Sequence, residues 1–414
     1  MRSNLSVAQP LLLIAGIAAS VVVVEPAPID LLLIGLAAWW LIYERLKLPL
    51  SYVVLGLVYV GASVVSQVIA GVNGVPFDTA VVRDLGIETY LVATVILLAA
   101  IFRKYPERMS AFVNGLVLGA VLVSSLFVAL KLVGRVPDIM FRDEHRVRVR
   151  GLFKDPNVLG PFLIFPILLL LFRNEVVRFP FARLAAIPCM LVLVLTYSRG
   201  AYVGFFAAIG LLILLVGLRE RISYANAAIA MSALAAAVAV GAITWSTAGL
   251  PGVEIETARL SYQSYDDDRF STLFTAFDYV VEHPLGNGVR SFAADHGSNP
   301  HNLLLGKATD AGILAGLIVV IVPLFAAARV LQKSTSRHSR FSLIVGAALV
   351  GNMVVSSVVY SHHWRHMFFL VALAFALTQS SESRRSTSDE GPHIDLTTEA
   401  LATRRRAEMI GQRS

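Results

Sequence analysis

The sequence predicts an all-α protein that crosses a membrane many times, and three observations support this. Of its 414 residues, 56% are hydrophobic and only 15% are charged, whereas charged residues make up about a quarter of an ordinary soluble domain. The mean hydropathy is +0.70. The apolar residues also form long runs, such as 51–72 and 111–130, which reach the roughly 20 residues that a helix needs to cross a bilayer.

Hydropathy predicts about twelve membrane spans. They lie near residues 11–24, 30–43, 51–72, 88–102, 111–133, 158–172, 184–198, 201–218, 224–246, 302–328, 341–360 and 367–379. Several are short for a full crossing, so a re-entrant hairpin is an alternative for one early pair. The first segment ends at VVVVEPAPID, which lacks a clear small-residue cleavage site, so we expect a retained first helix, with signal-peptide cleavage as the alternative.

Basic residues between these spans predict one orientation. They gather on alternate connections, namely Arg45 and Lys47, then Arg103, Lys104 and Arg108, then Arg173, Arg178 and Arg183, then Arg219 and Arg221, then Lys333, Arg337 and Arg340. Because positive charge is retained on the cytoplasmic side, both termini are predicted to be cytoplasmic. The net charge of +7 is explained in this way, and no nucleic-acid partner is expected.

The chain is predicted to form one transmembrane domain, residues 1–379, with two long outer loops at 134–157 and 247–301. The remaining residues, 380–414, are rich in Ser, Thr and charge, which is typical of a disordered cytoplasmic tail. The single cysteine, Cys189, lies within an apolar run, so no intrachain disulfide can form.

The first outer loop carries positive charge on the side where it is normally scarce. In HRVRVRG, the residues Arg146, Arg148 and Arg150 alternate with other residues, which favours an extended segment that places all three on one face. Lys154 follows in the same loop. The pattern indicates contact with an anionic group outside the membrane, and a solvated loop that pairs with lipid headgroups is the alternative.

The second outer loop contains a predicted amphipathic helix. Large apolar residues recur at helical spacing from Phe270 to Val281, so we expect the helix to lie along the outer membrane interface. Asp268 is its predicted N-cap, and Pro284 and the GNG triplet follow its end. The run of acids at 266–268 has a metal-binding alternative, but capping and the helix dipole explain it without a metal.

Arg199 interrupts the apolar run 193–217. Ionisable residues at membrane depth are costly and usually face an internal cavity. His301 and Asn302 open a later span, in which Lys307 and Asp310 are spaced to pair on one helix face. Since Arg199, Arg269, His301 and the basic loop all fall on the predicted outer side, we expect them to share one site.

The cluster HHWRH places His362 and His366 at a metal-compatible i, i+4 spacing. No third ligand is evident in the sequence. The cluster is therefore interpreted as an outer-interface belt with Trp364, and no metal site is predicted.

Four motifs occur in a distinctive order. They are FKDPNVLGPFL (153–163), TYSRGAYVGF (196–205), DRFSTLFTAFDYVVEHPLGNG (268–288) and PHNLLLGKATDAGI (300–313). With the long outer loop between the ninth and tenth spans, the chain resembles the superfamily of O-antigen ligases and O-antigen polymerases, which are bacterial envelope glycosyltransferases. The first 130 residues resemble that superfamily only in being hydrophobic.

The resemblance implies a GT-C-like helical bundle in the bacterial inner membrane, with its active site at the periplasmic face beneath the large loop. Such enzymes transfer a glycan from undecaprenyl pyrophosphate to a hydroxyl, on the lipid A core in ligases and on another lipid-linked glycan in polymerases. They need no metal or nucleotide cofactor. The resemblance assigns catalysis to Arg199, Arg269 and His301.

The resemblance also implies substrate contacts. Asn157 matches the asparagine of the DPN motif, and Asn302 belongs to the HN motif. Arg146, Arg148, Arg150, Lys154 and Arg290 are further candidate contacts without a firm motif position.

The chemistry of these residue types agrees with that implication. A guanidinium binds two phosphate oxygens and stays charged at low dielectric, so it stabilises the charge that develops on a departing pyrophosphate. A histidine, with an ordinary pKa of about 6.5, can accept a hydroxyl proton near neutral pH. Direct displacement would invert the anomeric carbon, although Glu254, Glu256 or Asp310 as a nucleophile remains an alternative.

Three functions remain open from the sequence. A ligase is favoured because the chain length and the compact loop suit it, and an O-antigen or exopolysaccharide polymerase is the alternative within the superfamily. A lipid-linked oligosaccharide flippase or other transporter is the alternative from a different class. Transporters often carry internal repeats and ionisable residues at mid-membrane, whereas here these residues gather at one face.

Overall fold

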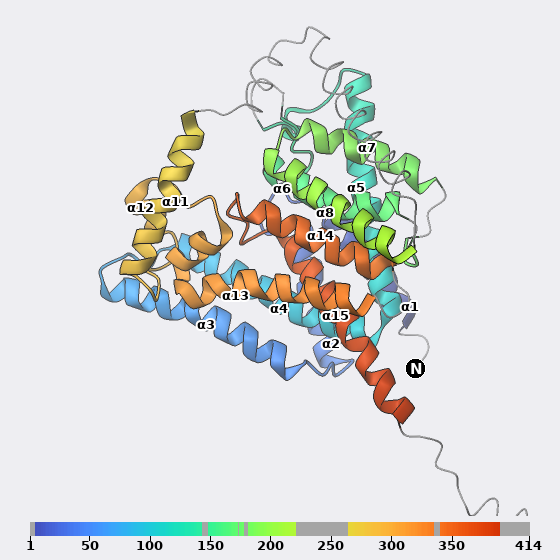
Figure 1. Ribbon diagram of the computed structural model, residues 1–414, viewed down its shortest axis with the longest axis horizontal. Helices are drawn as coiled ribbons and strands as arrows, with labels where there is room; N and C mark the ends of the chain where they lie inside the picture. Colours follow the sequence, from blue (N-terminus) through green and yellow to red (C-terminus); the bar gives the residue numbers. More distant parts are fainter. Residues whose placement is uncertain are drawn as a thin grey trace, which may run out of the picture.

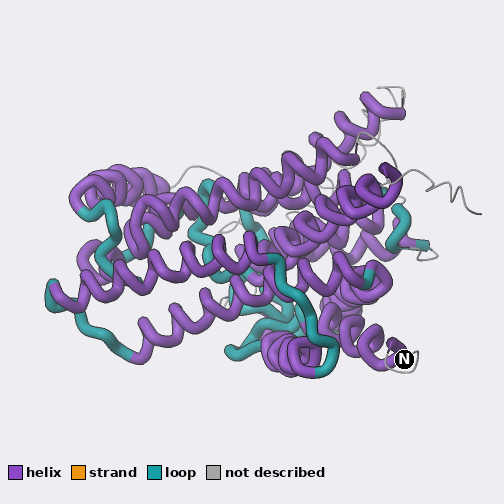
Figure 2. The backbone as a smooth tube through the Cα atoms, turned by 90° about the horizontal axis from the view of Figure 1, so that it is seen from below, coloured by secondary structure: helices purple, strands orange, loops and turns teal. Residues whose placement is uncertain are grey.

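The computed structural model describes residues 5–142, 148–172, 174–177, 181–220, 264–334 and 340–389. Within these ranges every regular element is a helix (Figure 2). The β pairing described there consists of two isolated bridges, Val22 with Phe153 and Phe141 with Val149. The predicted all-α class is confirmed for the described residues.

The helices follow the predicted spans closely (Figure 1). The first half contains α1 (Leu5–Ala18), α2 (Pro28–Ile42), α3 (Leu50–Val72), α4 (Thr79–Lys104), α5 (Pro106–Leu132), the short 3-10 helix η1 (Asp138–Met140), α6 (Pro156–Leu171), α7 (Ala182–Leu195) and α8 (Arg199–Glu220). The second half contains α11 (Ser264–Glu282), α12 (Ser291–His296), α13 (Leu303–Ser334), α14 (Arg340–Ser356) and α15 (Arg365–Asp389). Every predicted span overlaps one of these helices except 224–246, which lies outside the described residues.

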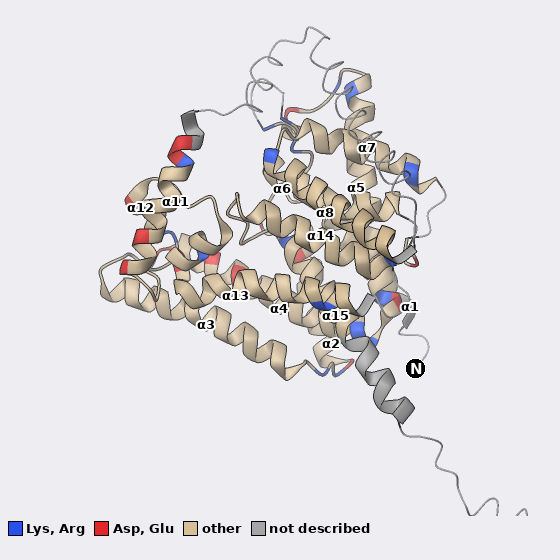
Figure 3. Ribbon diagram, viewed as in Figure 1, with Lys and Arg blue, Asp and Glu red and all other residues tan. Residues whose placement is uncertain are grey.

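Five described helices are long and apolar enough to cross a membrane by length and composition. They are Leu50–Val72, Thr79–Lys104, Pro106–Leu132, Arg199–Leu218 and Leu303–Gln332. Six further apolar helices are shorter, at 10–17 residues. The protein is therefore a helical membrane protein, and the count of about twelve crossings stays a prediction. Charged residues are sparse along the long helices, and several of them lie on α11 (Figure 3).

Local sequence signals explain where several helices begin. Asp78 accepts a hydrogen bond from the Val81 amide at 2.8 Å and caps α4. Asp155 accepts one from the Asn157 amide at 2.8 Å and caps α6, whose first residue is Pro156. Such side chains satisfy amide groups that have no partner within the helix, and proline suits the first helical position because its missing N–H is not needed there.

The core is built around α14, which is buried on nearly all sides. It packs against α6, α8, α13 and α15, and a helix that is apolar all round is expected in such a position. Contact with α8 is closest at Gly204, where an added Cβ would lie 2.6 Å from the carbonyl oxygen of Gly351. Glycine at both positions therefore brings the two backbones together and fixes the start of α8, where Arg199 lies.

Helices α11 and α12 lie at one end of the molecule and pack against α13 (Figure 1). The predicted amphipathic helix is confirmed: Ala276, Tyr279 and Val280 are buried. Its exposed side carries Phe270, Phe274, Phe277 and Val281.

The predicted N-cap of this helix is wrong. The helix α11 begins at Ser264, so Asp268 lies inside it, and the backbone carbonyl of Asp268 accepts hydrogen bonds from the Ser271 and Thr272 hydroxyls at 2.9 and 2.7 Å. The acidic run 266–268 lies within the helix and not before it, so none of its residues is the N-cap.

Candidate functional site

The helix α13 is broken near its start. Gly312 has φ 85° and ψ 167°, a conformation that glycine adopts without the steric cost that a side chain adds. The loop 284–290, which follows α11, fills the break: the Ile313 amide donates to the Pro284 carbonyl at 3.0 Å, and the Asn287 amide donates to the Thr309 carbonyl at 3.2 Å. Backbone groups freed by the break thus find partners in the loop, as a low-dielectric setting requires.

Two side chains of α3 hold the same loop. The Ser66 hydroxyl accepts from the Gly288 amide at 2.9 Å and donates to the Asp310 carbonyl at 2.7 Å. The Gln67 side-chain oxygen accepts from the Val289 amide at 3.0 Å. The loop, α3 and α13 are therefore joined as one unit, which fixes the position of Arg290 and of the end of α11.

Two of the predicted catalytic residues lie close enough for the charge of one to act on the other. Burial and the positive charge of Arg269 together lower the pKa of His301 below its ordinary value of 6.5. Arg269 lies in α11 and His301 directly precedes α13, so the packing of α11 on α13 produces this pairing. His301 is only partly buried, which leaves it accessible to a substrate.

Asn302 caps α13. Its side-chain oxygen accepts from the Leu305 amide at 3.0 Å, and its side-chain nitrogen donates to the Ser357 carbonyl at 2.9 Å. The amide of this predicted contact residue thus holds the loop 357–364 against the start of α13, next to His301.

A second group forms where the first outer loop meets the beginning of α8. The Arg148 guanidinium donates to the Thr196 carbonyl at 3.2 Å and to the Asn157 side-chain oxygen at 3.1 Å. The Val149 amide donates to the Leu195 carbonyl at 2.9 Å. Since α8 begins at Arg199, Arg148 of the first outer loop joins two motifs, the one that contains Asn157 and the one that contains Thr196 and Arg199.

Arg150 and Lys154 of the first loop also have partners. The Arg150 guanidinium donates to the carbonyls of Ile139 and Lys154, at 2.9 and 3.3 Å, and so helps to shape the loop. Lys154 forms an ion pair with Glu25 at 2.6 Å. Arg146 lies outside the described residues.

Arg290 is held from two sides. Its guanidinium forms an ion pair with Asp84 of α4 at 2.6 Å, and its backbone amide donates to the Asp310 carboxylate at 3.1 Å. The Tyr360 hydroxyl donates to the other oxygen of Asp310 at 2.5 Å. A buried Lys307 pairs with Glu88 of α4 at 2.5 Å, so the predicted i, i+3 pairing of Lys307 with Asp310 is wrong because a tertiary partner lies closer.

A polar pocket of about 270 Å³ opens between these groups. It is lined by residues of α4, the loop 284–290 and the loop 357–364, together with others: Glu25, Arg83, Asp84, Ile87, Lys154, Val289, Arg290, Asn299, Asp310, Tyr360, His362 and His363. Lys154 and Arg290 were sequence candidates and Asp310 was an alternative nucleophile, whereas Glu25 and Asp84 were not singled out. Asp84 lies next to an apolar segment, and an acid in that position is the sequence signal that could have identified this cavity.

The histidine cluster is not an exposed belt. Trp364 and His366 are each only 8% exposed, so the predicted interfacial role is wrong. His366 contacts the Asn352 side-chain oxygen through Nε2 at 3.1 Å, inside the helical core. Burial lowers the pKa of His362 well below its ordinary value and that of His363 to about 4, so both are neutral at pH 7.

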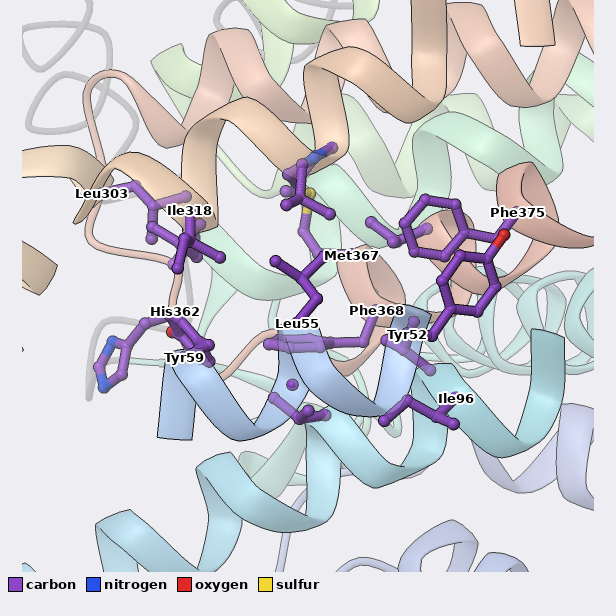
Figure 4. A pocket seen from close by; sticks show the side chains of 18 residues that line it. Tyr52, Leu55, Tyr59, Ile96, Leu303, Ile318, His362, Met367, Phe368 and Phe375 are labelled. Atoms are coloured by element: carbon purple, nitrogen blue, oxygen red, sulfur yellow. The ribbon is translucent and has the colours of Figure 1, made fainter. Parts of the chain in front are cut away.

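An apolar cavity of about 100 Å³ lies next to the polar pocket, between α3, α4, α13 and α15. Its walls include Tyr52, Leu55, Ile96, Met367 and Phe375 (Figure 4). His362 lines both spaces and stands at one end of the apolar cavity in Figure 4. The two environments, one apolar and one strongly polar, therefore adjoin.

The comparison with protein families gives a match over residues 184–320, to the family model described as O-antigen ligase. The matched region runs from α7 into α13 and includes Arg199, Arg269 and His301. This match confirms, over residues 184–320, the resemblance to the O-antigen ligase and polymerase superfamily. Three of the four sequence motifs fall inside the matched O-antigen ligase region, and FKDPNVLGPFL precedes it. Among curated proteins, no match is found.

Proposed function

We propose that this O-antigen ligase family member transfers a glycan from undecaprenyl pyrophosphate to a hydroxyl of the lipid A core. The reaction takes place at the periplasmic face of the bacterial inner membrane, on a GT-C-like bundle with both termini in the cytoplasm. It inverts the anomeric carbon and uses no metal. The observation that supports it most is that Arg269 and His301, two residues of the matched region, lie close enough for the charge of Arg269 to lower the pKa of His301.

In this proposal Arg199 and Arg269 bind the pyrophosphate. Cleavage of the bond between sugar and pyrophosphate adds negative charge to the departing oxygen. A guanidinium aimed at that oxygen stabilises the transition state more than the ground state, which accelerates the reaction. Arginine suits the role because its planar fork binds two oxygens and remains charged when water is excluded.

His301 acts as the general base. Its pKa lies below 6.5 because of burial and the neighbouring Arg269, so the imidazole is neutral and able to accept a proton at pH 7. The acceptor hydroxyl loses its proton to the imidazole as its oxygen attacks the anomeric carbon. The pyrophosphate leaves on the opposite face, and the electron pair of the broken bond goes with it.

The remaining candidate residues position the site. Arg148 and Asn157 support the turn before Arg199, and Asn302 supports the start of α13 next to His301. Lys154, Arg150 and Arg290, with Arg146, complete the proposed set of substrate contacts. The apolar cavity beside the polar pocket has the lining expected for part of a polyprenyl chain.

A transfer assay tests this function. Purified protein is mixed with an undecaprenyl-pyrophosphate-linked glycan and with lipid A core, and products are separated by gel and mass spectrometry. Glycan attached to the core is the expected result. Elongated lipid-linked glycan with no core product identifies a polymerase, and translocation into vesicles without any new bond identifies a transporter, so either outcome overturns the ligase proposal.

A further inference from the structure

The polar pocket differs from the proposed pyrophosphate site in its charge. Each cation that lines it already lies beside a carboxylate: Lys154 is 2.6 Å from Glu25, and Arg290 and Arg83 are 2.6 and 3.3 Å from Asp84. With Asp310, the three cations face three acids. A dianionic pyrophosphate placed here would have to displace these carboxylates and would be repelled by them.

The histidines of the pocket do not change its balance of positive and negative charge. His362 and His363 lie in the loop 357–364, and burial keeps both neutral at pH 7. The charges that face them from neighbouring elements include Asp84 and Glu88 of α4, Lys307 of α13 and Arg290. The pocket is thus formally neutral while remaining rich in hydrogen-bonding groups.

Among the residues that the structure describes, two buried polar atoms on the pocket wall lack a hydrogen-bond partner. They are the side-chain oxygen of Asn299 and Nδ1 of His362. Buried polar atoms without partners are rare in folded proteins and call for an occupant that supplies them. An acceptor oxygen and a ring nitrogen together suit hydroxyl groups, which both donate and accept.

Aromatic rings form one part of the wall. The Tyr360 and His362 rings stack with centroids 3.9 Å apart, and the His363 ring lies 3.7 Å from that of His362. The volume of about 270 Å³ lies near the lower end of the roughly 300–1,000 Å³ typical of small-molecule sites. This size suits a single ring with its hydroxyls better than a longer oligosaccharide.

We propose that this pocket is a subsite for one uncharged sugar unit of the glycan, separate from the arginines that bind pyrophosphate. The sugar hydroxyls donate to the carboxylates and to Asn299, and a hydroxyl meets Nδ1 of His362. The inference rests on the proposed function for the identity of the glycan as substrate. That the pocket binds an uncharged, hydroxyl-rich ring is inferred from the pocket residues alone.

Saturation-transfer NMR tests the subsite without turnover. Purified protein in detergent is mixed with methyl glycosides of glucose, galactose, rhamnose and N-acetylglucosamine, each at about millimolar concentration, where single-sugar binding is expected. At least one glycoside should give a signal that an unrelated membrane protein in the same detergent does not. Inorganic pyrophosphate should leave that signal unchanged.

Two variants locate the binding. Asn299→Leu removes the acceptor oxygen, and His362→Phe keeps an aromatic ring but removes Nδ1, so each should weaken sugar binding by about fivefold or more, the value of one lost hydrogen bond. Asn299→Ser replaces the leucine variant if size-exclusion chromatography shows aggregation. Arg199→Lys should retain the sugar signal while it loses transfer.

The outcomes separate the two proposals. Absence of a sugar signal, displacement by pyrophosphate, or full binding by both pocket variants would each overturn the subsite. A positive sugar signal in a protein that fails the transfer assay would overturn the enzymatic proposal and leave the subsite standing.

Discussion

Arg108 and Arg365 use their guanidinium groups to hold the fold together. Arg108 donates to both oxygens of Glu44 at 2.8 Å, and Arg365 donates to both oxygens of Asp30 at 2.8 and 2.6 Å. Both pairs are buried or nearly so, and a bidentate pair is the geometry that best offsets the loss of hydration. Their role is structural, in contrast to that proposed for Arg199 and Arg269.

Replacement of Arg199 by lysine tests the proposed pyrophosphate contact. The charge is kept, but the planar fork that binds two oxygens is lost. We expect transfer to fall by about two to three decades, the usual effect of removing one donor to a developing negative charge, while membrane insertion is unchanged. The measurement is the initial rate in the transfer assay, and near-normal activity would remove Arg199 from the mechanism.

The proximity of Arg269 to His301 predicts a pH effect with a definite sign. A general base works in its neutral form, so activity should fall as the pH drops through the pKa of His301, which lies below 6.5. Arg269→Gln removes a neighbouring positive charge, which raises this pKa. The acidic limb of the pH–activity profile, where activity falls because His301 is protonated, should therefore move to higher pH. Residual activity between pH 4.5 and 8, or histidine NMR titration, measures the shift.

Arg269→Lys is the matched control, because it keeps the charge and should leave the limb in place. A limb that stays unmoved in Arg269→Gln would show that Arg269 does not act on the base.

Among the elements, α8 and α14 depend on close backbone contact. An added Cβ at Gly204 would lie 2.6 Å from the Gly351 carbonyl oxygen, with Val355 also in the way, whereas at Gly210 in the same helix no atom of the described residues lies within 4 Å. Gly204→Ala should therefore cost about 1–3 kcal/mol through overpacking. Gly210→Ala should be neutral or slightly stabilising, because alanine favours the helix.

Thermal unfolding of the two purified variants compares them directly. Equal melting temperatures would contradict the close contact of α8 with α14. Because α8 begins at Arg199, we also expect Gly204→Ala, but not Gly210→Ala, to reduce transfer.

The pairing of Lys307 with Glu88 joins α13 to α4 inside the apolar region. Lys307 is 1% exposed, and its ammonium also lies 5.3 Å from the centre of the Tyr59 ring. Lys307→Met leaves the Glu88 carboxylate buried without its partner and should destabilise the protein by about 3–5 kcal/mol. Lys307→Met combined with Glu88→Leu should recover much of that loss, as the unfolding transitions of both variants in detergent will show.

For the whole molecule, the basic residues between the spans predict which loops face the cytoplasm and which face the outer side of the membrane. Native Cys189 is fully buried, so the wild-type protein should not react with a membrane-impermeant maleimide. In spheroplasts, Ile139→Cys in the first outer loop should be labelled, whereas Lys47→Cys should be labelled only after lysis. The reverse pattern would place the candidate site in the cytoplasm, where the proposed reaction would not occur.

The sequence alone determined the elements and their chemistry. Apolar runs predicted helices because backbone groups in a membrane must pair within their own segment, and the periodicity from Phe270 to Val281 predicted α11 because one face alone packs on the protein. The motifs around Arg199, Arg269 and His301 identified the superfamily, since local residue patterns carry that information without any knowledge of packing.

Tertiary structure decided which residues meet. Asp84 with Arg290, Lys307 with Glu88, and Glu25 with Lys154 are pairs whose partners lie far apart in the chain, and no local periodicity encodes them. The polar pocket likewise arises only where α4, the break in α13 and the loop 357–364 come together. Such contacts depend on how helices cross and where loops dock, which is fixed by packing between side chains from different segments.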